Sequence, residues 1–259
     1  MLEITPLFSG SSGNSIHIKH EKTELLIDAG VSCRSICNAL SKIGSSVEKI
    51  SCVLVTHEHS DHITGLEMLC KKYHIPVYVN VASAKSITSG GRNPYLSSCI
   101  KILDPGTELY LNDLHILPFR TPHDASGSVG YRINCDDDSF SYATDMGYVT
   151  REIARCVFGS KTVIFESNHD IEMLKNGVYP EHLKARILSD RGHLSNDACS
   201  KFIPHLAENG AERIILAHLS KDNNTPQKAF EASQEALKNA GFCDVCLEIA
   251  RRSILDDET

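Results

Sequence analysis

The feature that most constrains this chain is a group of metal-ligand side chains directly after a short apolar segment. Cys52 to Val55 reads as a buried strand, and the pattern His57-x-His59-x-Asp61-His62 follows it. Alternate residues of an extended segment project to the same side, so His57 and His59 can reach one metal ion. Asp61 and His62 lie past the bend and can reach a second ion. A polar surface loop is the alternative, but four ligand-type side chains in six positions favour metal binding.

One segment cannot complete the coordination of two ions, so further ligands must come from elsewhere. The candidates are His123, Asp145 and His218, each at or just past the end of a predicted strand. Those strands are Ile116 to Phe119, Phe140 to Ala143 and Ile214 to Ala217. Because strand ends in layered α/β folds gather functional side chains in one crevice, this shared position favours ligands over ordinary loop residues. Imidazole and carboxylate together suit zinc, manganese or iron better than magnesium or calcium.

Composition places the chain among ordinary globular proteins. Its 259 residues are 41% hydrophobic and 23% charged, which is enough apolar material for a real core. Large layered α/β domains commonly reach this length alone, so we expect one domain over residues 1–259. The amino terminus lacks a basic stretch followed by an apolar run, and no apolar segment reaches bilayer length. We therefore expect a cytoplasmic protein with no membrane partner.

The ten cysteines are scattered through the chain, several of them in apolar strand or helix patterns. A chain of this size needs no disulfide staples, so we expect reduced thiols that are structural bystanders. Cys243 and Cys246 have the spacing of a zinc knuckle or a redox pair. A knuckle needs a second pair and a redox pair usually opens a helix, and neither context is evident. We expect no site there.

Strand and helix patterns alternate in both halves of the chain. Extended segments are expected at Leu2 to Phe8, Ser15 to His20, Glu24 to Asp28, Val77 to Val79, Ile100 to Leu103, Gly130 to Asn134 and Thr162 to Phe165. Helices are expected at Ser32 to Ile43, Thr64 to Tyr73, Ser195 to His205 and Pro226 to Ala240. The pattern predicts an α/β fold, a four-layer αββα sandwich of two mixed sheets with flanking helices.

The order of the candidate ligands resembles that of the metallo-β-lactamase superfamily. Its motifs are an aspartate after an early strand, H-x-H-x-D-H, a histidine, an aspartate and a final histidine. All five can be matched in order: Asp28 in Leu25-Leu26-Ile27-Asp28-Ala29-Gly30, the central segment, His123, Asp145 and His218. The match spans nearly the whole chain.

The resemblance implies two divalent transition-metal ions per chain, zinc or manganese, with iron as a third candidate. It assigns the first ion to His57, His59 and His123. It assigns the second ion to Asp61, His62 and His218, with Asp145 as the bridge. Asp28 would accept a hydrogen bond and orient the loop of ligands.

Within the superfamily the chain resembles most the YycJ (WalJ) type of small DNA exonuclease. The segments that carry this likeness are Ser9 to Asn14, Phe165 to Asp170, Ile187 to Asn196 and His218 to Asn224. Candidate substrate-binding residues in the first two are Ser11, Ser12, Asn14, Asn168 and His169. The glycine-serine loop can present backbone N–H groups to phosphate, or it can be only a flexible turn.

His193, in Gly192-His193-Leu194-Ser195, resembles the histidine of transfer-RNA-processing relatives that protonates the departing oxygen. A histidine that merely precedes a helix is the alternative. The resemblance thus implies a phosphodiester hydrolase, a DNA exonuclease, with a dinuclear metal centre and a bridging hydroxide. Asp61 is expected to orient that hydroxide, and His193 to protonate the leaving oxygen.

Two other functions stay open. A thioesterase, lactonase or cyclic-nucleotide phosphodiesterase would use the same ligands. The net charge of −7 mildly favours it, because duplex DNA normally selects Lys and Arg at its phosphates. A metal-stabilised binding module without turnover is disfavoured by the complete ligand set and the additional His193. The sequence makes no prediction of oligomeric state.

Overall fold

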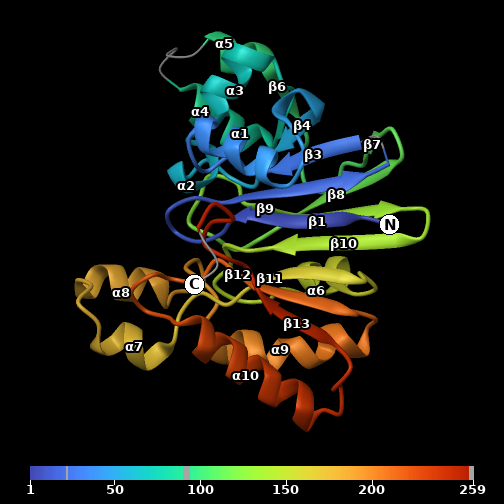
Figure 1. Ribbon diagram of the computed structural model, residues 1–259. Coiled ribbons are helices and arrows are strands. Elements are labelled where there is room, and N and C mark those ends of the chain that lie inside the picture. Colours follow the sequence, from blue (N-terminus) through green and yellow to red (C-terminus); the bar gives the residue numbers. More distant parts are fainter. Residues whose placement is uncertain (22, 90–93, 257–259) are drawn as a thin grey trace. The chain divides into compact units, whose positions relative to one another are not determined.

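The computed structural model describes residues 1–21, 23–89 and 94–256 (Figure 1). Contacts between residues divide the chain into two compact units. The first unit comprises residues 1–118, 125–129 and 251–259, and the second comprises residues 119–124 and 130–250. The expectation of a single domain over residues 1–259 stays a prediction.

The first unit is built on a six-stranded mixed sheet in the order β1-β2-β3-β4-β5-β6. Its strands are β1 (Glu3–Phe8), β2 (Ser15–His20), β3 (Thr23–Ile27), β4 (Ile50–Leu54), β5 (Val77–Val79) and β6 (Ile100–Ile102). Strands β1 to β3 are antiparallel neighbours, whereas β3 to β6 run parallel. The helices are α1 (Cys33–Lys42), the 3₁₀ helix η1 (Val47–Lys49), α2 (Ser60–Ile63), α3 (Leu66–Tyr73), α4 (Val81–Thr88) and α5 (Pro94–Cys99).

Helix α1 illustrates how the sequence produces this unit. The Ser32 side chain accepts a hydrogen bond from the Ser35 N–H and caps the helix start. Ile36, Ala39 and Leu40 recur at helical spacing and are fully buried in the same core as β3 and β4. Burial of each large apolar side chain of this kind contributes about 1.5–3 kcal/mol. The helix predicted from Ser32 to Ile43 is confirmed.

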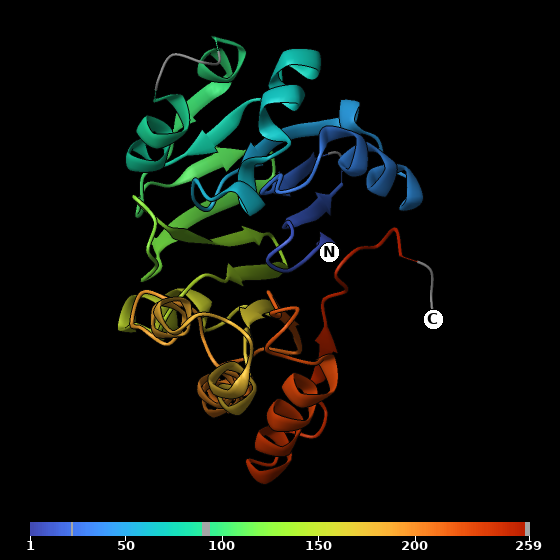
Figure 2. The same cartoon turned by 90° about the vertical axis from the view of Figure 1, so that its left-hand side faces the viewer.

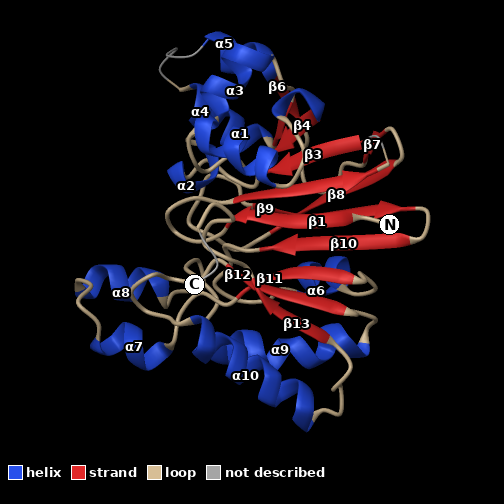
Figure 3. Cartoon of the chain, in the orientation of Figure 1, coloured by secondary structure: helices blue, strands red, loops and turns tan. Residues whose placement is uncertain are grey.

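The second sheet has seven strands in the order β13-β12-β11-β10-β9-β8-β7. They are β7 (Leu109–Leu111), β8 (Leu114–Arg120), β9 (Val129–Cys135), β10 (Asp138–Ala143), β11 (Thr162–Glu166), β12 (Arg213–Ala217) and β13 (Cys246–Ile249). Strands β10 to β13 run parallel and β9 is antiparallel to β10, so this sheet is also mixed (Figure 3). The helices of the second unit are α6 (Arg151–Val157), α7 (Ile171–Asn176), α8 (Glu181–Ile187), α9 (Asn196–Glu208) and α10 (Pro226–Asn239).

Helices α9 and α10 pack against each other, and α10 contacts β13 (Figure 1 and Figure 2). Ser195 caps α9 and Pro226 stands in the first turn of α10, as the sequence predicted. The core of this unit joins Phe165 of β11 to Ile203 of α9 and Leu237 of α10. Because β10, β11 and β12 are parallel neighbours, their carboxyl ends meet at one edge of the sheet.

Several short helices were not predicted. Helices α7 and α8 have six and seven residues, and two turns are too few for a helical period to stand out from loop sequence. Each of the ten cysteines lies in the described part of the chain and is a free thiol. Within residues 1–21, 23–89 and 94–256, no helix combines the length and apolar character of a membrane span.

Candidate functional site

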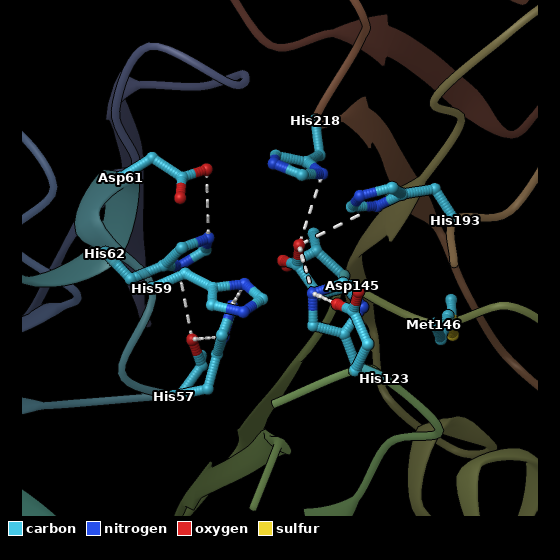
Figure 4. Close-up of polar contacts among 12 residues, drawn as sticks. His57, His59, Asp61, His62, His123, Asp145, Met146, His193 and His218 are labelled. Carbon is cyan, nitrogen blue, oxygen red and sulfur yellow. Dashed lines mark hydrogen bonds and ion pairs between the residues drawn. The ribbon is translucent and has the colours of Figure 1, made fainter. Parts of the chain in front are cut away.

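The ligand segment of the first unit follows β4, as predicted. Figure 4 shows the ends of the His57, His59, Asp61 and His62 side chains gathered together. The Nε2 atom of His57 lies 3.0 Å from Nδ1 of His59, and Nε2 of His62 lies 3.5 Å from Oδ2 of Asp61. Two nitrogen ligands of one tetrahedral zinc ion would lie about 3.3 Å apart. The spacing therefore suits a shared ion for each pair.

Asp28 supports this segment through contacts with Thr56 and His62. Its Oδ1 accepts a hydrogen bond from the Thr56 N–H at 2.8 Å, and its Oδ2 accepts one from Thr56 Oγ1 at 2.9 Å. Oδ2 also lies 2.7 Å from Nδ1 of His62. With Nδ1–H directed at the carboxylate, Nε2 is the unprotonated nitrogen of His62, the form in which a histidine binds a metal ion. These contacts are what the predicted role of Asp28 requires, and the role itself stays a prediction.

The glycine-serine loop is tied to the ligand segment through Asn14. Its Nδ2 donates to the carbonyl oxygen of Asp61 at 3.3 Å and lies 3.2 Å from Nε2 of His62. Its backbone N–H donates to the same carbonyl at 2.8 Å. Asn14 is buried, whereas Ser11 and Ser12 are exposed in the turn. Asn14 thus braces the loop, and a substrate role for these three residues stays a prediction.

Glu58, in the same segment, contacts residues outside the candidate ligands. Its Oε1 accepts a hydrogen bond from the Ser126 N–H at 2.6 Å, and its Oε2 accepts one from Ser83 Oγ at 2.7 Å. The carboxylate therefore fastens the 125–129 segment to α4 within the first unit.

Gly30 lies where the backbone of the ligand segment passes most closely. A Cβ at this position would lie 1.7 Å from the Asp61 carbonyl oxygen and 2.5 Å from the Asn14 nitrogen. We expect Gly30→Ala to lower the free energy of unfolding by at least the roughly 1–3 kcal/mol typical of overpacking, measured by urea denaturation. Gly44→Ala is the control for backbone strain alone, because φ is +76° there but nothing lies within 4 Å of the added methyl group, so a smaller loss is expected. Equal losses in both variants would contradict the steric explanation.

In the second unit the predicted ligands also follow strands. Asp145 lies two residues beyond β10, His218 directly follows β12, and His123 lies three residues beyond β8. Asp145 and His218 both have φ of 58°, in the left-handed region that Asp and His tolerate better than most residues. Oδ1 of Asp145 lies 3.5 Å from Nδ1 of His218 and 3.7 Å from Nε2 of His123 (Figure 4). The structure therefore brings these three predicted residues together.

Glu166 belongs to the same cluster and was not predicted as a functional residue. Its Oε1 lies 2.7 Å from Nδ1 of His193 and 3.0 Å from Nδ1 of His218, and its Oε2 accepts from the Met146 and Leu194 N–H groups. Burial by itself would raise the pKa of Glu166, but these two histidines outweigh it and lower the pKa to about 2. The available signal was an acidic residue closing an apolar strand between those that carry Asp145 and His218.

His193 packs between two predicted ligands. Its ring centre lies 5.0 Å from that of His123 and 5.1 Å from that of His218. The Nδ1 atom of His123 lies 3.1 Å from the Gly192 carbonyl oxygen, so a proton on Nδ1 leaves the Nε2 lone pair for a metal ion. Burial lowers the pKa of His123, which favours the neutral form that binds metal.

Asn168 and His169 lie two and three residues beyond β11. Nδ2 of Asn168 donates to the His218 carbonyl oxygen at 2.7 Å, and its backbone N–H donates to the Leu194 carbonyl at 2.8 Å. His169 is 1% exposed, and neither ring nitrogen has a hydrogen-bond partner among the described residues. Burial lowers its pKa to about 4. The substrate-binding role assigned to both residues stays a prediction.

The donor atoms of the second unit fit a metal ion. Ligand atoms of Asp145, Glu166, His193 and His218 all lie within 4.8 Å of one another, and three of these residues are buried. Neutral imidazole nitrogens and carboxylate oxygens are the donor set of zinc, manganese and iron sites. The second unit thus carries a cluster of the metal-binding type, and the first unit carries the ligand-type residues His57, His59, Asp61 and His62.

Comparisons with known proteins agree with this arrangement. The family model described as "Beta-lactamase superfamily domain" matches residues 23–219. Exodeoxyribonuclease WalJ of Streptococcus pneumoniae serotype 2 (strain D39) is 39% identical over 224 residues, 86% of this chain and 83% of WalJ. Exodeoxyribonuclease YycJ of Bacillus anthracis is 34% identical over 241 residues, 93% of this chain and 91% of YycJ.

The fold is also that of solved structures. Zn²⁺-bound PqqB of Methylobacterium extorquens superimposes with a TM-score of 0.73 at 17% identity, covering 99% of this chain and 100% of PqqB. The predicted fold class, two mixed sheets with flanking helices in a metallo-β-lactamase fold, is confirmed.

Proposed function

This chain belongs to the metallo-β-lactamase superfamily, and we propose that it is an exodeoxyribonuclease that hydrolyses DNA phosphodiester bonds with two divalent metal ions. Two relatives that match over most of their length carry the name exodeoxyribonuclease. The observation that carries the proposal is the contact between Glu166 and His193 beside Asp145 and His218. An imidazole supported by a buried carboxylate is equipped to protonate a departing oxygen.

The ligand assignment of the proposal follows the order of the family's motifs in the sequence. His57, His59 and His123 would hold one ion, and Asp61, His62 and His218 the other, with Asp145 shared. When bound, the two ions supply an activated water near neutral pH and neutralise charge on the phosphate oxygens. The donor set is compatible with zinc, manganese or iron.

In this proposal Glu166 is a positioning residue. Its carboxylate accepts Nδ1–H of His193 and orients the ring, which in its doubly protonated form can give a proton from Nε2 to the leaving oxygen of the DNA. The same oxygen atom receives Nδ1–H of His218, so Nε2 of His218 keeps its lone pair for a metal ion. One buried acid would thereby set the tautomers of a proton donor and a ligand.

Asp61 has the second catalytic role in the proposal. Its carboxylate is 23% exposed and lies beside His62 in the first unit. A partly exposed carboxylate can accept a hydrogen bond from the attacking water and fix the direction of attack. The same carboxylate is a proposed metal ligand, so Asp61 would both bind a metal ion and orient the attacking water.

A small-molecule hydrolase, such as a thioesterase, lactonase or cyclic-nucleotide phosphodiesterase, is the second candidate. The observation that favours it is the net charge of −7, because proteins that bind duplex DNA broadly carry basic surfaces. Such substrates would need the same clusters but no binding of a polymer backbone. The two candidates therefore differ in substrate and not in ligands.

The test is a substrate panel with protein loaded with zinc or manganese. End-labelled linear DNA, covalently closed circular DNA, a lactone, a glutathione thioester and a cyclic nucleotide are incubated with and without a chelator. We expect the linear DNA to be degraded from its ends, the closed circle to stay intact, and the chelator to stop the reaction. Hydrolysis of a small molecule with intact linear DNA would replace the proposal by the second candidate. Cleavage of the closed circle would exclude an enzyme that needs DNA ends.

A further inference from the structure

Arg191 is a fixed and exposed cation at the cluster of the second unit. Its Nε and Nη2 donate to the backbone carbonyl oxygen of His123, at 3.1 and 3.0 Å. The ring of His123 in turn contacts the carbonyl of Gly192, the next residue after Arg191. Side chain and backbone therefore lock the guanidinium to the segment that carries a proposed ligand.

The charge of Arg191 is not neutralised. Its two hydrogen bonds go to an uncharged carbonyl, and it forms no ion pair with any residue in the described part of the chain. Nearby Arg186 differs, because its guanidinium forms a two-point ion pair with the carboxylate of Asp124. Of these two arginines, only Arg191 keeps its charge for an external anion.

The turn that carries Arg191 is tightly packed. A Cβ on Gly192 would lie 2.1 Å from the Ile187 carbonyl oxygen, and a Cβ on Gly147 would lie 2.3 Å from the Asp190 carbonyl carbon. The turn is thus wedged between the end of α8 and the loop that begins at Asp145. An arginine on such a support loses little conformational freedom when it binds a ligand.

We propose that Arg191 binds a backbone phosphate of the DNA strand beside the scissile phosphodiester, an assignment that rests on the proposed exodeoxyribonuclease function. A guanidinium has five N–H donors, and the carbonyl of His123 uses two of them. The remaining donors include a parallel pair on the two terminal nitrogens, which matches two phosphate oxygens. A chain with a net charge of −7 needs such local cations to hold a polyanion.

Arg191→Met, Arg191→Lys and the control Arg155→Met test this. Arg155 is exposed on α6. Each metal-loaded protein is assayed on linear DNA and on bis(4-nitrophenyl) phosphate, which has no flanking phosphate, and DNA binding is measured by fluorescence anisotropy at several salt concentrations. We expect Arg191→Met to raise KM and Kd for DNA about tenfold. Its salt slope, log Kd against log salt, should fall by about 0.7 to 0.9, one phosphate contact.

The other readouts separate charge from structure. Arg191→Met should lose much more of its rate on DNA than on bis(4-nitrophenyl) phosphate, Arg191→Lys should keep the parental salt slope, and the control Arg155→Met should keep the parental metal content and both rates. Parental Kd and salt slope in Arg191→Met would overturn the assignment, as would equal losses on both substrates together with loss of metal. Parental protein that binds DNA without cleaving it would refute the proposed function, while the salt slope would still decide the role of Arg191. Parental protein that neither binds nor cleaves DNA would overturn both.

Discussion

Asp145→Ala is expected to lose bound metal and to reduce DNA hydrolysis to background. The Asp145 carboxylate is buried, and its Oδ1 faces His218 and His123. A methyl group offers no ligand atom, so the loss of metal affinity should exceed the roughly 10- to 100-fold caused by changing groups that only support ligands. Elemental analysis of dialysed protein and an end-labelled DNA assay measure the two effects.

Asp145→Gly separates ligand loss from misfolding. Because φ at this position is 58°, glycine adopts the backbone conformation more readily than aspartate. The glycine variant should therefore lack metal, yet unfold at the temperature of the metal-free parental protein or above it. Asp190→Ala, at an exposed acid in the same unit, is the control that should keep both metal and activity. Full metal occupancy in Asp145→Ala would remove this residue from the ligands.

His57→Ala, a substitution in the first unit, should also cause loss of metal. The removed imidazole places its Nε2 3.0 Å from the neighbouring His59 nitrogen. If His57→Ala lost metal and Asp145→Ala did not, the ligands would lie in the first unit without the proposed bridge.

His193→Ala is expected to keep its metal while losing roughly 10²- to 10⁴-fold in turnover on DNA, the usual contribution of a positioned proton donor. The Nδ1 atom of His193 is held by Glu166, which leaves Nε2 for the leaving oxygen. The loss should shrink on bis(4-nitrophenyl) phosphate, because a good leaving group departs without a proton. Added imidazole should restore part of the rate on DNA. Metal content and steady-state rates on both substrates are the measurements.

A different outcome would identify a different role for His193. Its ring also offers a ligand atom within 4.8 Å of those of Asp145, Glu166 and His218, so loss of metal in His193→Ala would make it a ligand. A parental rate on DNA would exclude it as the proton donor and favour the small-molecule candidate. His182→Ala, at an exposed histidine of α8, is the control for loss of an imidazole in general.

The predictable parts of this protein have local signals. Ser32 and Gly44 mark the ends of α1, and the spacing of its buried residues is helical over the whole length between them. The ligand segment from His57 to His62 is equally local, because an apolar strand and the ligand-type residues are contiguous. Such signals need no knowledge of the rest of the chain.

Glu166 shows why other residues could not be predicted. Its partners His193 and His218 are 27 and 52 residues away in the sequence. The contact exists because β11 lies between β10 and β12 in the sheet, and strand order is set by packing that no single segment encodes. The position of Glu166 at the end of an apolar strand was a local signal, but no local pattern says which distant histidines an acid at a strand end will contact.

Arg191 makes the same point for charge. It lies in the Ile187 to Asn196 segment, but no local pattern says whether it or Arg186, five residues earlier, forms an ion pair, and both are exposed. Only the folded chain places Asp124 against Arg186 and the neutral carbonyl of His123 against Arg191. The sequence by itself determined most of the strands, the main helices, the proposed ligands and the family, because these depend on contiguous patterns and on motif order. Tertiary structure alone decided that Glu166 contacts His193 and His218, and that Arg186 forms an ion pair whereas Arg191 does not. These pairings are made between segments that are distant in the chain.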